Sequence, residues 1–128
     1  MRRLNFLPIL QTLDDTDGGF SLPFGPVFMS PKSMAEAALE ALAGPEIQKK
    51  RTLKRLLDLF DVGSQAVEAA YGNKESDKIA YLDTGISPAR IYIVNEDSVI
   101  TNAANGSLSS YLDHASKIDE MFPKLTQN

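Results

Sequence analysis

The stretch KIAYLDTGISPARIYIVNEDSVIT, residues 78–101, decides the expected fold. Its segments 78–84, 89–95 and 99–101 are rich in β-branched and aromatic residues, which favour strands. The sequences GISP and NEDS between them are typical of turns, because Gly, Pro, Asn and Asp adopt turn conformations readily. We therefore expect a small antiparallel meander sheet over residues 78–101.

Helical patterns lie on both sides of this stretch. Residues 33–71 contain strong helix formers with apolar residues at helical spacing, interrupted by Gly and Pro. Residues 107–122 place their apolar side chains on one helical face, which predicts a C-terminal amphipathic helix with Ser107 as its N-cap. Residues 1–31 are Pro-rich and predict an irregular arm. Helices first and strands later favour an α+β fold, with helices packed on the meander in a single domain over residues 1–128.

Composition excludes several classes of function. A chain of 128 residues with 43% hydrophobic content can bury one core. The net charge of -4 argues against a general attraction to nucleic acid or anionic lipid. The absence of cysteine excludes disulfides, thiol catalysis and Cys-based metal sites. Because the sequence contains no apolar run of bilayer length and no clear leader, we expect a cytoplasmic protein.

No set of residues in the sequence suggests catalysis or a cofactor. His114 is the only histidine, and Ser110 and Asp113 are its helix neighbours, so they do not form a convergent triad. The acidic turn DDTDGG, residues 14–19, lacks the spacing of a calcium loop, and no phosphate-binding glycine motif is present. We therefore expect a non-enzymatic protein with no cofactor and no metal site.

The basic run QKKRTLKR forms a positive patch within an acidic chain. On a helix these side chains lie on adjacent faces at i, i+4 spacing, where they could meet an anionic partner. The predicted helix that follows carries no basic residue to contact bases, so a nucleic-acid binder is the third hypothesis of function. The residues of this patch are Lys49, Lys50, Arg51, Lys54 and Arg55.

The C-terminal third carries a family resemblance. A predicted hairpin leads through a polar junction into NGSLSSYLDHASKID, in which residues 107–112 have the form S-L-x-x-[FY]-L. This order resembles the C-terminal end of SUKH-superfamily proteins over residues 78–122. That superfamily contains bacterial immunity proteins that neutralise toxins, often nucleases. The resemblance implies a protein-binding module that blocks a toxin partner.

Such a partner would present a basic toxin surface to acidic residues at the hairpin ends. The candidate contacts are Asp83, Glu96 and Asp97. The second hypothesis is a structural or oligomeric adaptor of phage or secretion assembly, because strands with apolar residues on both faces could pair across a homodimer. The residues leave these alternatives open.

Overall fold

The computed structural model describes residues 25–26, 28 and 34–124. The chain divides into two compact units, Met1–Ala37 and Ala38–Asn128, and almost all described residues belong to the second. The irregular arm expected over residues 1–31 lies almost entirely outside the described residues, so it remains a prediction, as does the single-domain organisation.

Two helices open the described part. Helix α2 covers Met34–Ala43 and helix α3 covers Pro45–Leu57. Gly44 separates them with φ of 92°, a left-handed conformation that glycine adopts at no steric cost. Pro45 suits the first turn of α3, because a proline there gives up an amide that would have no helical partner.

A strand–helix–strand unit follows. The 3₁₀ turn η1, Gly63–Ala66, leads into strand β1, Ala70–Gly72. Helix α4, Glu75–Asp83, and the 3₁₀ turn η2, Pro88–Arg90, connect it to strand β2, Ile91–Val94. Strands β1 and β2 pair in parallel, with Tyr71 opposite Tyr92. Helix α4 is therefore the crossover that a parallel pair requires.

The rest of the sheet is antiparallel. Strand β3, Ile100–Asn102, pairs with β2, and strand β4, Leu108–Ser109, pairs with β3. The sheet thus has four strands in the order β1-β2-β3-β4. This mixed sheet with helices confirms the predicted α+β class.

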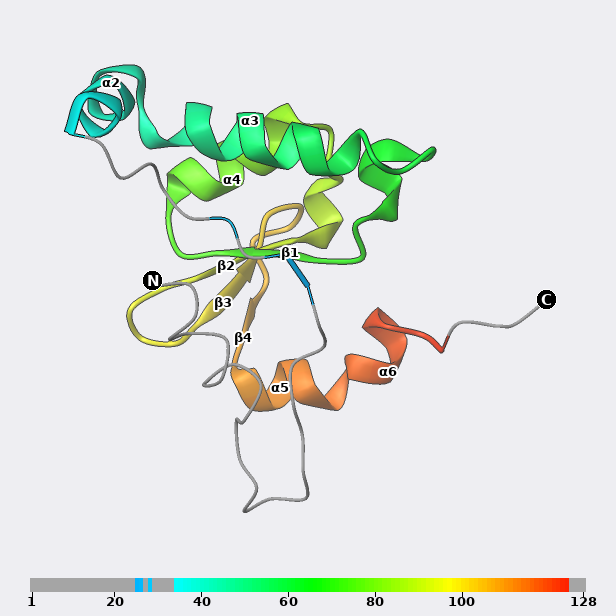
Figure 1. Cartoon of the computed structure of the whole chain (residues 1–128). Helices are drawn as coiled ribbons and strands as arrows, with labels where there is room; N and C mark the ends of the chain where they lie inside the picture. Colours follow the sequence, from blue (N-terminus) through cyan, green and yellow to red (C-terminus); the bar gives the residue numbers. More distant parts are fainter. Residues whose placement is uncertain (1–24, 27, 29–33, 125–128) are drawn as a thin grey trace, which may run out of the picture. The chain divides into compact units, whose positions relative to one another are not determined.

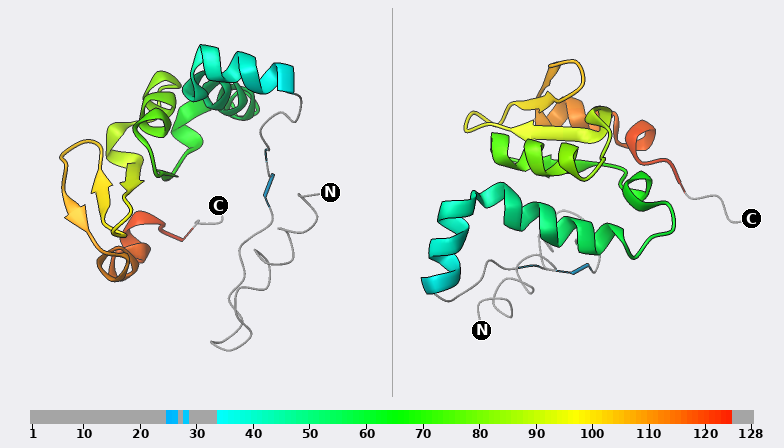
Figure 2. Two further views of the ribbon diagram at one scale, coloured as in Figure 1. Left: turned by 90° about the vertical axis from the view of Figure 1, so that its left-hand side faces the viewer. Right: turned by 90° about the horizontal axis from the view of Figure 1, so that it is seen from above.

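Within the second unit, the helices cover both faces of the sheet. Helix α3 packs beside α4 over one face, and helices α5, Tyr111–Ser116, and α6, Ile118–Met121, lie on the other (Figures 1 and 2). The core on the α4 side contains Ala70, Ile86 and Ile91, with Leu53 and Tyr81 packed against them. Full burial of a side chain such as Ile91 contributes about 1.5–3 kcal/mol, so this layer fixes the position of α4 on the sheet.

Several elements differ from those expected. The predicted strand over 78–84 is helix α4, because Lys74 and Asp77 start a helix whose inward positions are Asp77, Ala80 and Tyr81. The predicted helical segment over 33–71 ends earlier, and its last residues form β1.

The C-terminal helix also begins later than expected. Residues 108–109 pair with β3, and the N-cap is Ser110, whose hydroxyl accepts the Asp113 amide at 3.1 Å. In the part of the chain that the structure describes, no helix has both the length and the apolar character needed to cross a membrane. The cytoplasmic location stays a prediction.

Candidate functional site

Asp77 is the buried charged side chain of the described residues, with 7% of its surface exposed. It lies in the first turn of α4, immediately after the carboxyl end of β1. Its Oδ2 accepts the backbone amides of Asn73 at 3.0 Å and Lys74 at 3.1 Å. These bonds fix the carboxylate where ligands bind in open α/β sheets, at the carboxyl end of a parallel strand.

Lys49 of α3 is the cationic partner of Asp77. Its Nζ donates a short hydrogen bond to Asp77 Oδ1 and lies 3.5 Å from the Ser76 hydroxyl oxygen. The Lys49 side chain is 42% exposed, whereas that of Asp77 is 10% exposed. A lysine ammonium has three donors, so Lys49 can hold Asp77 and still offer a proton to an anionic group on its open side.

Gly72 allows Asp77 to lie against the end of β1. A Cβ added to Gly72 would be only 2.9 Å from both Cγ and Oδ2 of Asp77. No residue with a side chain fits there unless the carboxylate moves. The sequence from Gly72 to Asp77 is therefore a strand end, a tight loop and a helix start built around one carboxylate.

Electrostatics keep this carboxylate ionised. Burial raises the pKa of Asp77, but the Lys49 hydrogen bond, the amides of Asn73 and Lys74 and the Lys49 charge together hold it below its ordinary value. Tyr81, whose hydroxyl donates to the Tyr71 carbonyl oxygen at 2.6 Å, has its pKa raised by burial and by the Asp77 charge. The site thus holds a permanent anion and an accessible cation near neutral pH.

The described residues contain no group of three or more acidic or histidine side chains that could hold a metal ion. A metal at this site would have Asp77 as its ligand from this part of the chain, with the remaining ligands supplied by other groups. Binding of an anion by Lys49 requires no such addition.

The structure separates the residues of the predicted basic patch. Lys49 binds Asp77, Lys50 lies 3.4 Å from Asp83, and Lys54 lies 3.4 Å from Asp58. Arg51 and Arg55 are exposed. Because several of its charges are already paired, the patch is weaker than the sequence indicates, and its role as an anionic-partner surface stays a prediction.

The predicted acidic contacts do not form one surface element. Glu96 and Asp97 lie in the exposed turn between β2 and β3, whereas Asp83 ends α4 and faces Lys50. Their proposed role in partner binding stays a prediction.

Asp77 is the residue that sequence reasoning missed. The segment GNKESD, residues 72–77, has the composition of a loop, but its aspartate was not among the candidate site residues. The available signal was local: a glycine and asparagine after a short apolar segment, then an acidic residue at the third position of a helix. The contact with Lys49 had no local signal.

Comparison with known proteins identifies relatives. A family model described as LNS2 (Lipin/Ned1/Smp2) matches residues 8–123. Human phosphatidate phosphatase LPIN2 is 32% identical over 114 residues, which cover 87% of this chain and 13% of that protein. Nuclear elongation and deformation protein 1 of Schizosaccharomyces pombe is 33% identical over 114 residues, 84% of this chain and 17% of that protein.

A third relative is phosphatidic acid phosphohydrolase 1 of Saccharomyces cerevisiae, 29% identical over 123 residues that cover 84% of this chain and 14% of that protein. The chain therefore spans less than a fifth of the length of each of these relatives.

These matches correct the function expected from the sequence. The SUKH resemblance was wrong, because the matched family covers nearly the whole chain and is a different one. The pattern behind it, residues 107–112, spans β4, a cap and the start of α5, an order that is common in unrelated folds. The immunity-protein hypothesis falls with it. The adaptor and nucleic-acid alternatives lose support as the main function, because relatives carry the names of phosphatases. The expectation of a non-enzymatic protein was also wrong, since relatives carry the names of enzymes.

Proposed function

Because this chain belongs to the LNS2 (Lipin/Ned1/Smp2) family, we propose that it takes part in the hydrolysis of phosphatidate, with Lys49 and Asp77 at the substrate phosphate. The observation that carries the proposal is the Lys49–Asp77 pair beside the carboxyl end of β1. The names of the relatives support the substrate, and the exposed ammonium supports the binding of its phosphate group.

The chemistry assigns Lys49 a direct role. Hydrolysis breaks the bond between phosphorus and the glycerol oxygen, and water supplies the oxygen that leaves with the phosphate. Negative charge lies on the non-bridging oxygens throughout, and a preorganised ammonium stabilises it. Lys49 would contact one of these oxygens through a donor that Asp77 does not use.

Asp77 is a positioning residue in this proposal. Its carboxylate accepts a hydrogen bond from Lys49 and holds the ammonium in one orientation. The two backbone amides that bind Asp77 hold the carboxylate itself in place.

Two measurements on the purified protein test the proposal. The first is phosphate release from vesicles of phosphatidate and phosphatidylcholine, and the second is binding to the same vesicles by co-sedimentation. We expect Lys49→Gln to lower kcat/KM about 10²-fold, the loss typical of one donor to a transition-state oxygen. Lys49→Arg should restore part of it, because the charge is kept.

Lys54→Gln is the matched control, since Lys54 lies on the same helix, is exposed and pairs with Asp58. It should leave both measurements within twofold of the wild-type value. The proposal fails if the wild-type protein neither binds phosphatidate vesicles nor releases phosphate. It also fails if Lys49→Gln and Lys54→Gln behave alike.

A further inference from the structure

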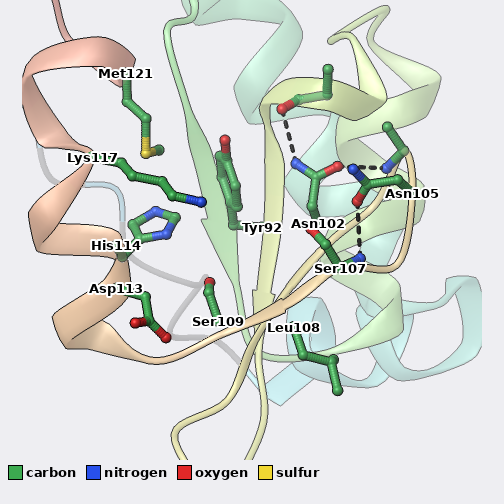
Figure 3. Close-up of a pocket in the computed structure, with 12 residues that line it drawn as sticks. Tyr92, Asn102, Asn105, Ser107, Leu108, Ser109, Asp113, His114, Lys117 and Met121 are labelled. Carbon is green, nitrogen blue, oxygen red and sulfur yellow. Dashed lines mark hydrogen bonds between the residues drawn. The ribbon is translucent and has the colours of Figure 1, made fainter.

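A cavity of about 330 Å³, open to the surface and lined mostly by exposed residues, lies on the sheet face opposite Lys49 and Asp77. Alternation along the strands separates the two faces: Ala70 and Ile91 face the core beneath α4, whereas Tyr71 and Tyr92 face His114 of α5. The cavity is lined by β2, β3, β4, the loop after β3 and helices α5 and α6 (Figure 3). Its volume lies within the range of small-molecule sites.

The cavity has a rigid wall. Tyr92 stacks on Tyr71 with ring centroids 5.3 Å apart, and His114 meets Tyr92 edge-on at 4.8 Å. The Nε2 atom of His114 and the Tyr71 hydroxyl are hydrogen-bonded at 2.7 Å. These contacts fix the rings of His114 and Tyr92.

Several hydrogen-bond donors line this cavity. Lys117 extends its ammonium toward Tyr92, and it makes no salt bridge with any residue that the structure describes (Figure 3). Asn105 accepts the Ser107 amide at 2.9 Å through Oδ1, which orients its amide nitrogen. The hydroxyls of Ser107 and Ser109 also line the cavity.

The same cavity contains one carboxylate, Asp113. Its Oδ2 accepts the Ser110 amide at 3.1 Å and the Ser110 hydroxyl at 2.9 Å. The Ser110 amide bond, then the Ser110 hydroxyl bond and, least, the charge of Lys117 lower the pKa of Asp113, whereas burial raises it slightly. A permanent carboxylate disfavours a bare anion, but it accepts hydrogen bonds from hydroxyl groups. The lining therefore suits a ligand with one anionic end and neighbouring hydroxyls.

We propose that this cavity binds a small phosphorylated polyol, with the phosphate at Lys117, Asn105 and the serine hydroxyls and the polyol hydroxyls toward Asp113. The phosphate brings several acceptor oxygens to a cation and neutral donors. This site is separate from Lys49 and Asp77, and its binding of a ligand does not depend on the proposed hydrolysis. A free polyol phosphate and the glycerophosphate headgroup of a lipid share this chemistry.

The test uses sn-glycerol 3-phosphate as the probe and follows the NMR signals of Lys117 and the Asn105 side-chain amide. We expect saturable shifts of these signals with glycerol 3-phosphate, weaker ones with inorganic phosphate and none with glycerol. Lys117→Gln should weaken binding about tenfold, the loss of one charge-assisted hydrogen bond. Lys124→Gln, a nearby lysine that does not line the cavity, should bind as the wild type does.

Two further measurements distinguish a lipid headgroup from a free polyol phosphate, and the cavity from the Lys49–Asp77 site. If water-soluble dioctanoyl phosphatidate competes with glycerol 3-phosphate, as judged by these NMR signals, the ligand is a lipid headgroup. If it does not compete, the ligand is a free polyol phosphate. Lys49→Gln should not change the shifts, so loss of the proposed hydrolysis leaves this inference intact. Equal affinity of Lys117→Gln and wild type, or shifts confined to the surroundings of Lys49, would overturn it.

Discussion

Gly72 lies so close to Asp77 that a Cβ on the glycine would be 2.9 Å from the carboxylate Oδ2 atom. The last residue of β1 and the third residue of α4 can therefore lie in contact only because the first of them is a glycine. This contact places the buried carboxylate beside the strand end, where Lys49 reaches it.

Replacing Gly72 with alanine tests this contact. The added methyl group must displace Asp77, so we expect Gly72→Ala to lower the free energy of unfolding by about 1–3 kcal/mol, as overpacking does. Urea unfolding measures this change. Gly25→Ala is the control, because no atom of the described residues lies within 4 Å of a Cβ added there, and it should stay within about 0.5 kcal/mol of wild type. Equal stability of the two variants would contradict the contact.

The lowered pKa of Asp77 makes stability depend on pH. The folded-state pKa lies below the unfolded value of about 3.9, so the native state gains stability that is present above this value. This stability is lost as the pH falls through the folded-state pKa. Urea unfolding between pH 7 and pH 2 should show a smaller acid loss for Asp77→Asn than for wild type.

Asp113 needs its own variant in that experiment, because its pKa is also lowered and it titrates in the same direction. The Asp113→Asn protein should keep the contribution of Asp77. An acid loss in Asp77→Asn as large as in wild type would show that Lys49 does not hold the carboxylate.

Ile91 tests the core beneath α4. It has no exposed surface, so Ile91→Ala should lower the free energy of unfolding by about 2–5 kcal/mol through lost burial and a cavity. Ile79→Ala removes the same atoms from a side chain of α4 that is 41% exposed, and it should have a much smaller effect. Thermal unfolding followed by circular dichroism compares the two variants. Equal losses of stability would contradict the burial of Ile91 in the core.

The start of α5 can be located by two serine variants. Ser110→Ala removes the hydroxyl that accepts the Asp113 amide, and it should cost about 1 kcal/mol of stability. Ser107→Ala should cost little, because Ser107 precedes β4 rather than the helix. If Ser107→Ala were the more damaging variant, the helix would begin where the sequence pattern first indicated.

The sequence identifies the fold class but not the pairing of its parts. Helical patterning and the hairpin over 91–102 are local properties, and both are visible in the residues. Residues 78–84 are ambiguous, because Ala80 and Tyr81 fit an inward helical face while their apolar neighbours also suit a strand. The packing of α4 on β1 and β2 resolved the ambiguity, and such packing is not a local property.

The candidate site shows the same limit. Lys49 was recognised as part of a charged run, but its partner was not, because Asp77 meets it only after α3 has packed on α4. Buried charge is the feature that singles out Asp77, and burial is known only once the chain has folded.

The crossover between β1 and β2 has a consequence for the order of folding. Pairing Val94 with Ile100 closes a short loop, whereas pairing Ala70 with Ile91 closes one that contains all of α4. The longer loop loses more entropy on closure, so we expect the hairpin to form first and the parallel pair last. Pulse-labelling hydrogen exchange should protect the β2–β3 amides before those of β1. During synthesis, Lys49 and Asp77 emerge from the ribosome before β2. The parallel pair beside them can therefore form only after residues 91–94 have been synthesised.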